Sequence, residues 1–152
     1  MTSHSETRVL PYSAQQMYDL VADVARYPEF LPWTAAARIR SVEDRGDHQE
    51  LLAYLLISFK LFRETFGSLV RLRPAEKRIE TEYVNGPFKQ MESVWRFRDV
   101  PGGVEVSFAT EFEFKNRLLQ KAAGVFFYEA MRQVVRAFEK RAQMLYGMRS
   151  TA

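Results

Sequence analysis

A strand pattern runs directly into a long helix pattern over residues 104–146 of this 152-residue chain. Within residues 104–114, the even positions are valine, phenylalanine or threonine, whereas the odd positions are glutamate, serine or alanine. After Asn116 the apolar residues recur every three or four positions, at Leu119, Ala123, Phe126, Phe127, Ala130, Val134, Ala137 and Phe138. An apolar strand face followed by an apolar helix face predicts a helix packed on a sheet. We expect the space between the two to decide the function.

Composition and length are those of one globular domain, because 47% of the residues are hydrophobic and 27% are charged. The absence of cysteine excludes disulfides, thiolate nucleophiles and cysteine-ligated metals. The N-terminus shows no signal pattern, and the longest apolar run, 51–57, is well short of the ~20 residues of a membrane-spanning helix. We therefore expect a soluble, cytoplasmic protein.

Turn residues divide the remaining chain into a first strand, two short helices and six further strands. Ser13 and Gln16 form a capping box for a helix over 13–22, and Pro28 and Pro32 limit a second helix to about 23–30. The strand patterns occupy 4–10, 35–43, 49–59, 62–73, 78–84, 89–100 and 103–114. This order predicts an α+β fold in which a curved antiparallel sheet of about seven strands wraps round the long C-terminal helix.

The Pro101–Gly103 turn predicts the register of the last hairpin, with Arg98 opposite Glu105 and Trp95 opposite Phe108. The first pair would face outward and the second inward. Glu111 and Glu113 share a strand face and could imitate a catalytic pair of carboxylates. Because they alternate with phenylalanines, we expect them to face solvent instead, near Arg96 and Arg98.

The sequence gives little support to catalysis. His4 and His48, the only histidines, lie in a terminal segment and beside a turn, and neither has a partner at a catalytic or metal-ligand spacing. Glycines 102 and 103 belong to a hairpin turn rather than to a phosphate-binding loop. We therefore predict a protein that is not an enzyme and that requires no metal or cofactor.

The C-terminal helix is the basic element of the chain. Residues 115–152 hold eight Lys and Arg against two Glu, a net charge of +6. Arg132, Arg136 and Lys140 form a stripe opposite the apolar face, which suits a solvated helix face, an anionic membrane or RNA phosphates. Arg141 instead projects from the apolar face. It could extend to solvent, pair with a buried carboxylate, or mark a polar end of a cavity.

Two further features suggest a cavity between helix and sheet. The segment 27–33 is aromatic and bounded by prolines, so it either caps the end of the sheet or gates a cavity, with Phe59–Phe62 as an opposing gate. Gly124 lies inside the helix pattern, where glycine costs about 1 kcal/mol relative to alanine. It allows either close packing against a strand or room for a ligand.

Several motifs together resemble the coenzyme Q-binding protein family of the START-like, helix-grip superfamily, which includes polyketide-cyclase-type domains. The resemblance covers about residues 3–147 and rests on Tyr18–Val24, Tyr27–Trp33, Asn85–Lys89, Trp95–Phe97, Val106–Phe114 and Ala137–Ala142. Many relatives carry a cysteine after the tryptophan, where this chain has Thr34. The resemblance implies a deep apolar pocket and non-catalytic binding of ubiquinone in support of respiration or quinone synthesis. Bacterial relatives are also described as ribosome-association toxins, and the shared motifs leave both functions open.

We therefore predict a carrier or chaperone for a hydrophobic ligand, with ubiquinone as the bound molecule. A ribosome-binding inhibitor is the alternative, and a cyclase-like enzyme is a third hypothesis. In the carrier hypothesis the basic stripe of Arg132, Arg136 and Lys140 contacts anionic lipid, which places the protein peripherally at the inner membrane. The predicted ligand-binding residues are Phe30, Leu31 and Trp33 at the mouth, Phe88, Met91, Trp95 and Phe108 on the sheet, and Phe126, Phe127, Ala130 and Met131 on the helix.

Overall fold

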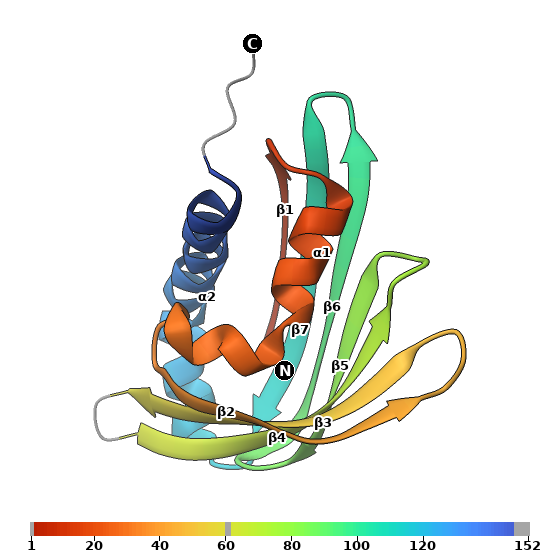
Figure 1. Ribbon diagram of the computed structural model, residues 1–152. Helices are drawn as coiled ribbons and strands as arrows, with labels where there is room; N and C mark the ends of the chain where they lie inside the picture. The colour runs from red at the N-terminus through yellow and green to blue at the C-terminus, as the bar shows by residue number, and fades with distance from the viewer. Residues whose placement is uncertain (1, 60–61, 148–152) are drawn as a thin grey trace.

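The computed structural model describes residues 2–59 and 62–147, with the side chains in these ranges except those of 59, 62 and 123–128. Figure 1 shows the elements in their predicted order. They are β1 (Thr2–Leu10), α1 (Ala14–Ala22), the 3-10 helix η1 (Val24–Glu29), β2 (Thr34–Asp44), β3 (Gln49–Phe59), β4 (Phe62–Arg73), β5 (Arg78–Asn85), β6 (Phe88–Val100), β7 (Gly103–Phe114) and α2 (Arg117–Tyr146). All seven predicted strands are present, with ends that differ by no more than two residues.

The strands form one antiparallel sheet in the order β1-β7-β6-β5-β4-β3-β2. Its curvature, seen in Figure 1, brings β2, β3 and β4 across one end of the concave face. The predicted register of the last hairpin is confirmed, because Trp95 lies opposite Phe108 and Arg98 opposite Glu105. An ion pair of 2.9 Å joins Arg98 to Glu105 on the outer face. The inner positions of β6 and β7 therefore face the helices.

The same register corrects the prediction for Glu111 and Glu113. Glu111 faces outward and is exposed, as expected, but it lies opposite Glu92. Arg96 and Arg98 lie nearer the hairpin turn and pair with other residues of β7. A two-residue turn fixes every later pair along the ladder, so the glutamates, far from that turn, cannot reach these arginines.

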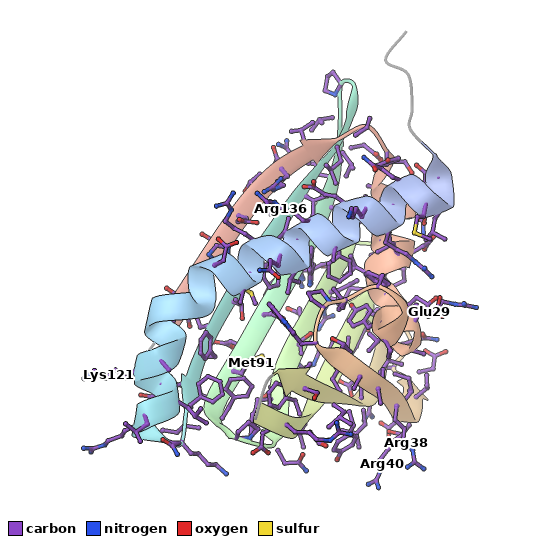
Figure 2. The ribbon with its side chains drawn as sticks, turned by 90° about the vertical axis from the view of Figure 1, so that its left-hand side faces the viewer. Glu29, Arg38, Arg40, Met91, Lys121 and Arg136 are labelled. Atoms are coloured by element: carbon purple, nitrogen blue, oxygen red, sulfur yellow. The ribbon has the colours of Figure 1, made fainter. Side chains whose placement is uncertain are left out.

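Both α-helices cover the concave face of the sheet (Figures 1 and 2). Helix α1 packs on β6 and β7, and α2 packs on β1, β7 and α1. Met17 and Val21 of α1 and Val104 of β7 are the largest fully buried side chains among the described residues. The main core thus lies under α1, and the C-terminal half of α2 extends it through Phe138 and Ala142.

The start of α1 is fixed by the predicted capping box. The Ser13 hydroxyl accepts from the Gln16 backbone N–H at 3.0 Å, and the Gln16 side chain accepts from the Ser13 backbone N–H at 3.0 Å. The second short helix is η1, a 3-10 helix that contains Pro28. Proline removes a backbone donor, which shortens the segment relative to the predicted 23–30.

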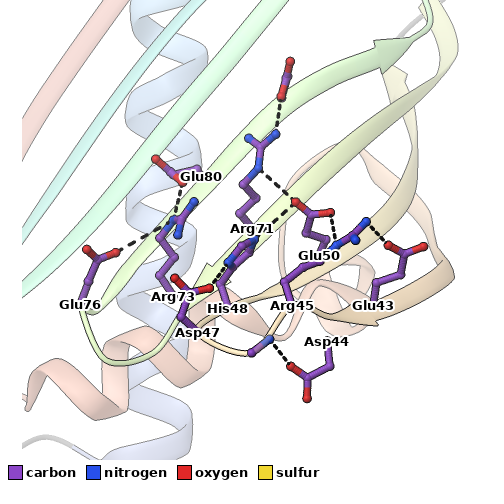
Figure 3. A network of polar contacts seen from close by, with 12 residues as sticks. Glu43, Asp44, Arg45, Asp47, His48, Glu50, Arg71, Arg73, Glu76 and Glu80 are labelled. Atoms are coloured by element: carbon purple, nitrogen blue, oxygen red, sulfur yellow. Dashed lines mark hydrogen bonds and ion pairs between the residues drawn. The ribbon is translucent and has the colours of Figure 1, made fainter.

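A network of opposite charges joins strands β3, β4 and β5 (Figure 3). The Glu50 carboxylate accepts a hydrogen bond from Arg45 at 3.1 Å and lies 3.4 Å from both Arg71 and His48. Arg73 continues the network to the Glu80 carboxylate at 2.6 Å. The charges alternate across neighbouring strands, so each attraction also favours the correct register.

Candidate ligand-binding site

An aromatic cluster joins the sheet to α2. Trp95 of β6 and Phe108 of β7 are cross-strand neighbours with ring centroids 4.4 Å apart. Phe138 of α2 lies edge-on to Trp95 at 5.1 Å. Trp95 is 9% exposed and Phe138 is 4% exposed, so these rings form the described contact layer between helix and sheet. Trp95 and Phe108 are two of the predicted site residues.

The aromatic segment 27–33, which begins inside η1, packs onto the same layer. The Phe30 ring lies 5.3 Å from Phe138, and the Tyr27 ring lies 5.5 Å from it. The Tyr27 hydroxyl donates to the backbone carbonyl of Val21, and burial raises the pKa of this phenol. Leu31 packs on the core beside them. The segment therefore caps the end of the core, and its rings reach the helix as the gate hypothesis requires.

Arg141 links this segment to α2. Its guanidinium donates to the Glu29 carboxylate at 2.8 Å and lies 5.1 Å from the centre of the Phe30 ring. This hydrogen bond is the main cause of the lowered pKa of Glu29. Of the three predicted possibilities for Arg141, pairing with a carboxylate is the one observed, but the Glu29 side chain is 47% exposed rather than buried. Only the arginine, at 11% exposed, is enclosed.

Trp33 connects the aromatic segment to the sheet. Its backbone carbonyl accepts from the Ser58 backbone N–H at 2.8 Å, next to the end of β3. Trp33 has a φ of 62°, a left-handed conformation that is uncommon for a bulky residue. The predicted opposing gate, Phe59–Phe62, lies outside the described side chains. The predicted gate is therefore described on one side only.

Phe88 and Met91 lie away from the Trp95 layer. Phe88 belongs to a second aromatic cluster, with centroid distances of 4.7 Å to Phe114, 5.0 Å to Phe66, 5.5 Å to Tyr83 and 5.7 Å to Phe112. Met91 lines an open hollow of about 400 Å³ where the β5–β6 ladder ends. The predicted sheet residues thus fall into two groups, which a single small ring could not contact together.

The helix residues of the predicted site are described only in part. Ala130 and Met131 are half-buried, whereas Gly124, Phe126 and Phe127 lie outside the described side chains. Val135, which the helical pattern did not place on the apolar face, is 9% exposed and faces the Trp95 layer. Its neighbour Val134 is only partly buried, so the buried face is rotated from the predicted one.

The basic stripe lies on the opposite side of α2. Arg136 and Lys140 are exposed, and Figure 2 shows Arg136 on the outward side of the helix. Arg132 is half-exposed and lies 3.8 Å from Glu129. The stripe is therefore a solvated helix face in this structure, with two exposed cations available to an anionic partner.

A narrow slot between β1 and α2 holds polar groups that the sequence analysis did not identify. Its volume is about 20 Å³, close to the space of one water molecule. Glu6 and Arg8 of β1 and Glu139 of α2 line it beside Trp95 and Phe108. The Arg8 guanidinium donates to the Glu139 carboxylate at 2.8 Å and bridges strand and helix. Arg8 and Glu6 are two positions apart, which was the available signal for a shared face.

Each histidine has a carboxylate neighbour within two positions of it in the sequence. His4 is 3.5 Å from Glu6, and His48 lies between Asp47 at 2.7 Å and Glu50 at 3.4 Å. Within the described part of the chain, however, no cluster of three or more His, Cys, Asp or Glu is placed to hold a metal ion. Likewise, no helix among the described residues has both the length and the apolar character needed to cross a membrane.

Comparison with known proteins places these features in a family. Residues 10–139 match the family described as "Polyketide cyclase / dehydrase and lipid transport". Ribosome association toxin RatA of Rickettsia prowazekii is 36% identical over 146 residues, which cover 94% of this chain and 97% of the toxin. The mitochondrial coenzyme Q-binding protein COQ10 homolog B of Xenopus laevis is 35% identical over 149 residues, which cover 95% of this chain but 59% of that protein.

A solved structure agrees with these relatives. The solution structure of an 18 kDa protein from Caulobacter crescentus superposes with a TM-score of 0.82 at 34% identity, covering 97% of this chain and 100% of that one. The predicted helix-grip, START-like fold and the predicted kinship with coenzyme Q-binding proteins and ribosome-association toxins are confirmed. The chain belongs to the polyketide cyclase / dehydrase and lipid transport family, as a relative of both RatA and COQ10 proteins.

Proposed function

We propose that the protein is a non-catalytic carrier or chaperone of a hydrophobic ligand, an isoprenoid quinone such as ubiquinone, held between α2 and the concave face of the sheet. The observation that carries this proposal is the aromatic layer of Trp95, Phe108, Phe138 and Phe30. It joins a strand pair, a helix and the aromatic segment, and that segment is attached to the helix through ring contacts with Phe138 and an ion pair between Glu29 and Arg141. Flat aromatic surfaces suit a planar quinone ring.

Apolar burial supplies enough free energy for such a ligand without catalytic groups. Each Å² of apolar surface removed from water contributes about 25 cal/mol. The slot beside Trp95 holds only about one water molecule, so a quinone ring enters only if α2 or the loop moves. Phe30, Leu31 and Trp33 are the proposed mouth, because they lie on the loop whose contact with α2 would open. The proposed inner contacts are Trp95 and Phe108, with Ala130 and Met131 on the helix, while Phe88, Met91, Phe126 and Phe127 would contact the isoprenoid tail.

Extraction of the purified protein with organic solvent, followed by mass spectrometry, tests this function. We expect an isoprenoid quinone in near-stoichiometric amount, or uptake of added ubiquinone by protein that extracts clean. A clean extract together with no uptake of added ubiquinone would refute the carrier. A Trp95→Ala variant should lose uptake, whereas Val42→Ala, at a position 57% exposed on β2, should retain it.

An alternative function is inhibition of ribosomal subunit association. It is favoured by the near full-length match to a RatA toxin and by the exposed cations Arg136 and Lys140. Overexpression should then deplete 70S particles in a sedimentation profile. Replacing Arg132, Arg136 and Lys140 by glutamine should abolish the depletion, because phosphate contacts depend on positive charge.

The chain offers a matched control for that experiment. Arg38 and Arg40 of β2 are exposed and lie far from Arg136 in Figure 2. Their replacement by glutamine removes two positive charges from another surface, one fewer than the helix variant, and should leave the depletion unchanged. Equal loss in both variants would show a general charge effect, and an unchanged profile in the helix variant would exclude the stripe as the contact. For the carrier, the same two variants, compared for binding to anionic vesicles, test whether the stripe contacts membrane.

A further inference from the structure

The inner face of β1 is polar although it faces the aromatic layer. β1 is an edge strand that pairs with β7, and its even residues are consistently less exposed than its odd ones. The inward series is Thr2, His4, Glu6, Arg8 and Leu10. A strand that only closed the core would carry apolar residues on this side. The charged side chains therefore bring polar chemistry to an otherwise aromatic site.

Glu6 carries a shielded acceptor atom within this series. Its side chain is 17% exposed, and its Oε2 is shielded from solvent without a hydrogen bond to any described group. The Arg8 Nε lies 4.0 Å from Oε2, beyond hydrogen-bond distance, while Arg8 Nη1 donates to Glu139. Glu6 Oε1 lies 3.5 Å from the His4 ring. A buried acceptor without a donor is costly, so a donor that reaches it gains free energy.

The surroundings of Glu6 define the shape of that donor. The slot that Glu6 lines is walled by the rings of Trp95, Phe108 and Phe138 and by Met17. Once α2 or the loop has moved, a flat aromatic ring can lie against these walls, with a hydroxyl on its edge directed at Glu6. Glu139, which lines the same slot, already accepts from Arg8. The free acceptor capacity is therefore at Glu6.

We propose that Glu6 binds the head group of a hydroxyl-bearing aromatic lipid, so that the protein prefers the hydroquinone (reduced) form over the quinone. This inference rests on the proposed ligand-binding function and specifies the redox state of the ligand. An ionised carboxylate accepts hydrogen bonds and cannot donate them. A hydroquinone hydroxyl donates to it, whereas a quinone presents two carbonyl oxygens that repel it. No bond is made or broken in the ligand, and its redox state is set elsewhere.

Tryptophan fluorescence provides a direct test. The protein is used without a background substitution, because its two tryptophans are Trp33, in the proposed mouth, and Trp95, which lines the slot. Quenching is titrated without oxygen, using a short-chain ubiquinone and the same compound reduced beforehand to its hydroquinone. Since a hydrogen bond to a charged group contributes roughly 1.5–3 kcal/mol, we expect the hydroquinone to bind at least about tenfold more tightly.

Two variants locate the preference. Glu6→Gln keeps the size of the side chain but adds a donor, so the two forms should bind within about twofold of each other. Glu105→Gln removes a negative charge from the outer face of β7, where Glu105 pairs with Arg98, and should keep the full preference. Thermal melts of each variant identify any loss of folding. If a variant does not fold, the relative affinity of the protein that keeps Glu6 for hydroquinone and quinone still tests the proposal.

The outcomes are distinguishable. Equal affinity for both forms, tighter binding of the quinone, or a preference that persists in Glu6→Gln would overturn the role of Glu6 while leaving the carrier function intact. Failure of both forms to bind would instead refute the proposed function itself.

Discussion

Replacing Phe138 by alanine should be among the most destabilising single changes in α2. The ring is 4% exposed and lies against Trp95 of the sheet and against Tyr27 and Phe30 of the loop. Burying a phenylalanine removes about 150 Å² or more of surface from water, which at about 25 cal/mol per Å² corresponds to about 4 kcal/mol. This lies within the range of about 3–5 kcal/mol for Phe→Ala changes in cores.

Urea denaturation followed by circular dichroism measures this loss. With a denaturant slope of about 2 kcal/mol per M, the unfolding midpoint should fall by about 2 M. Met144→Ala is the matched control, because Met144 lies on the same helix but is 75% exposed and should change stability by no more than about 0.5 kcal/mol. A loss below about 1 kcal/mol for Phe138→Ala would refute the packing of α2 against both sheet and loop.

The same variant connects stability with ligand binding. Removing the ring enlarges the space beside Trp95, so a quinone that binds there should recover part of the lost stability. Added ubiquinone should therefore raise the midpoint of Phe138→Ala more than that of Met144→Ala. Equal shifts in both variants would place the ligand away from Phe138.

Other predictions concern the loop and the charged network. Arg141→Met should speed amide hydrogen exchange in η1, since it removes the ion pair with Glu29 that links η1 to α2. Arg26→Met leaves that ion pair intact and should not speed exchange, and equal exchange in the two variants would show that the Arg141–Glu29 pair does not hold η1. The hydrogen bond from His48 lowers the pKa of Asp47 below its ordinary value of 3.8. The stability that this hydrogen bond gives the folded state is therefore complete above pH 3.8, and it is lost as the pH falls through the lower pKa of the folded state. His48→Gln should reduce the acid sensitivity of the urea midpoint, and unchanged sensitivity would show that the pair contributes nothing. Burial raises the pKa of Tyr18 from 10.0 to about 12. The neutral phenol therefore contributes to folding stability fully below pH 10, and this contribution is lost as the pH rises from 10 to about 12. Absorbance at 295 nm follows the ionisation of the phenol.

The fold was predictable because its signals are local. Alternation along the strands, turn residues between them and the Ser13 cap each depend on a few neighbouring residues, and the Pro101–Gly103 turn fixes a whole ladder. Glu111 was predicted to lie near Arg96 and Arg98, but its cross-strand neighbour is Glu92. Counting along the ladder from the turn would have given this pair. The aromatic pair Trp95 and Phe108 followed from the same register.

The polar part of the site was not predictable from periodicity. In β1 the inward and outward faces are both largely polar, so alternation separates two faces without indicating which one faces the helix. The contacts of Arg8 with Glu139, and of Arg141 with Glu29, join residues more than a hundred positions apart. Such pairs depend on how α2 is placed on the sheet, and they appear only once the tertiary structure is known.

One turn of α2 brings the competing functions into contact. In residues 138–141, Phe138 faces the aromatic layer, Glu139 pairs with β1, Lys140 is exposed in the basic stripe, and Arg141 holds the loop. A ring that enters the slot by displacing α2 moves this turn, and with it the outward cation. The turn then has one position with the ligand bound and another without it. If a ribosome or membrane binds these two positions with different affinity, the ligand and the surface partner change each other's binding affinity by the same factor. Carrier and inhibitor would then be coupled activities of one helix, so each assay should be run with and without quinone.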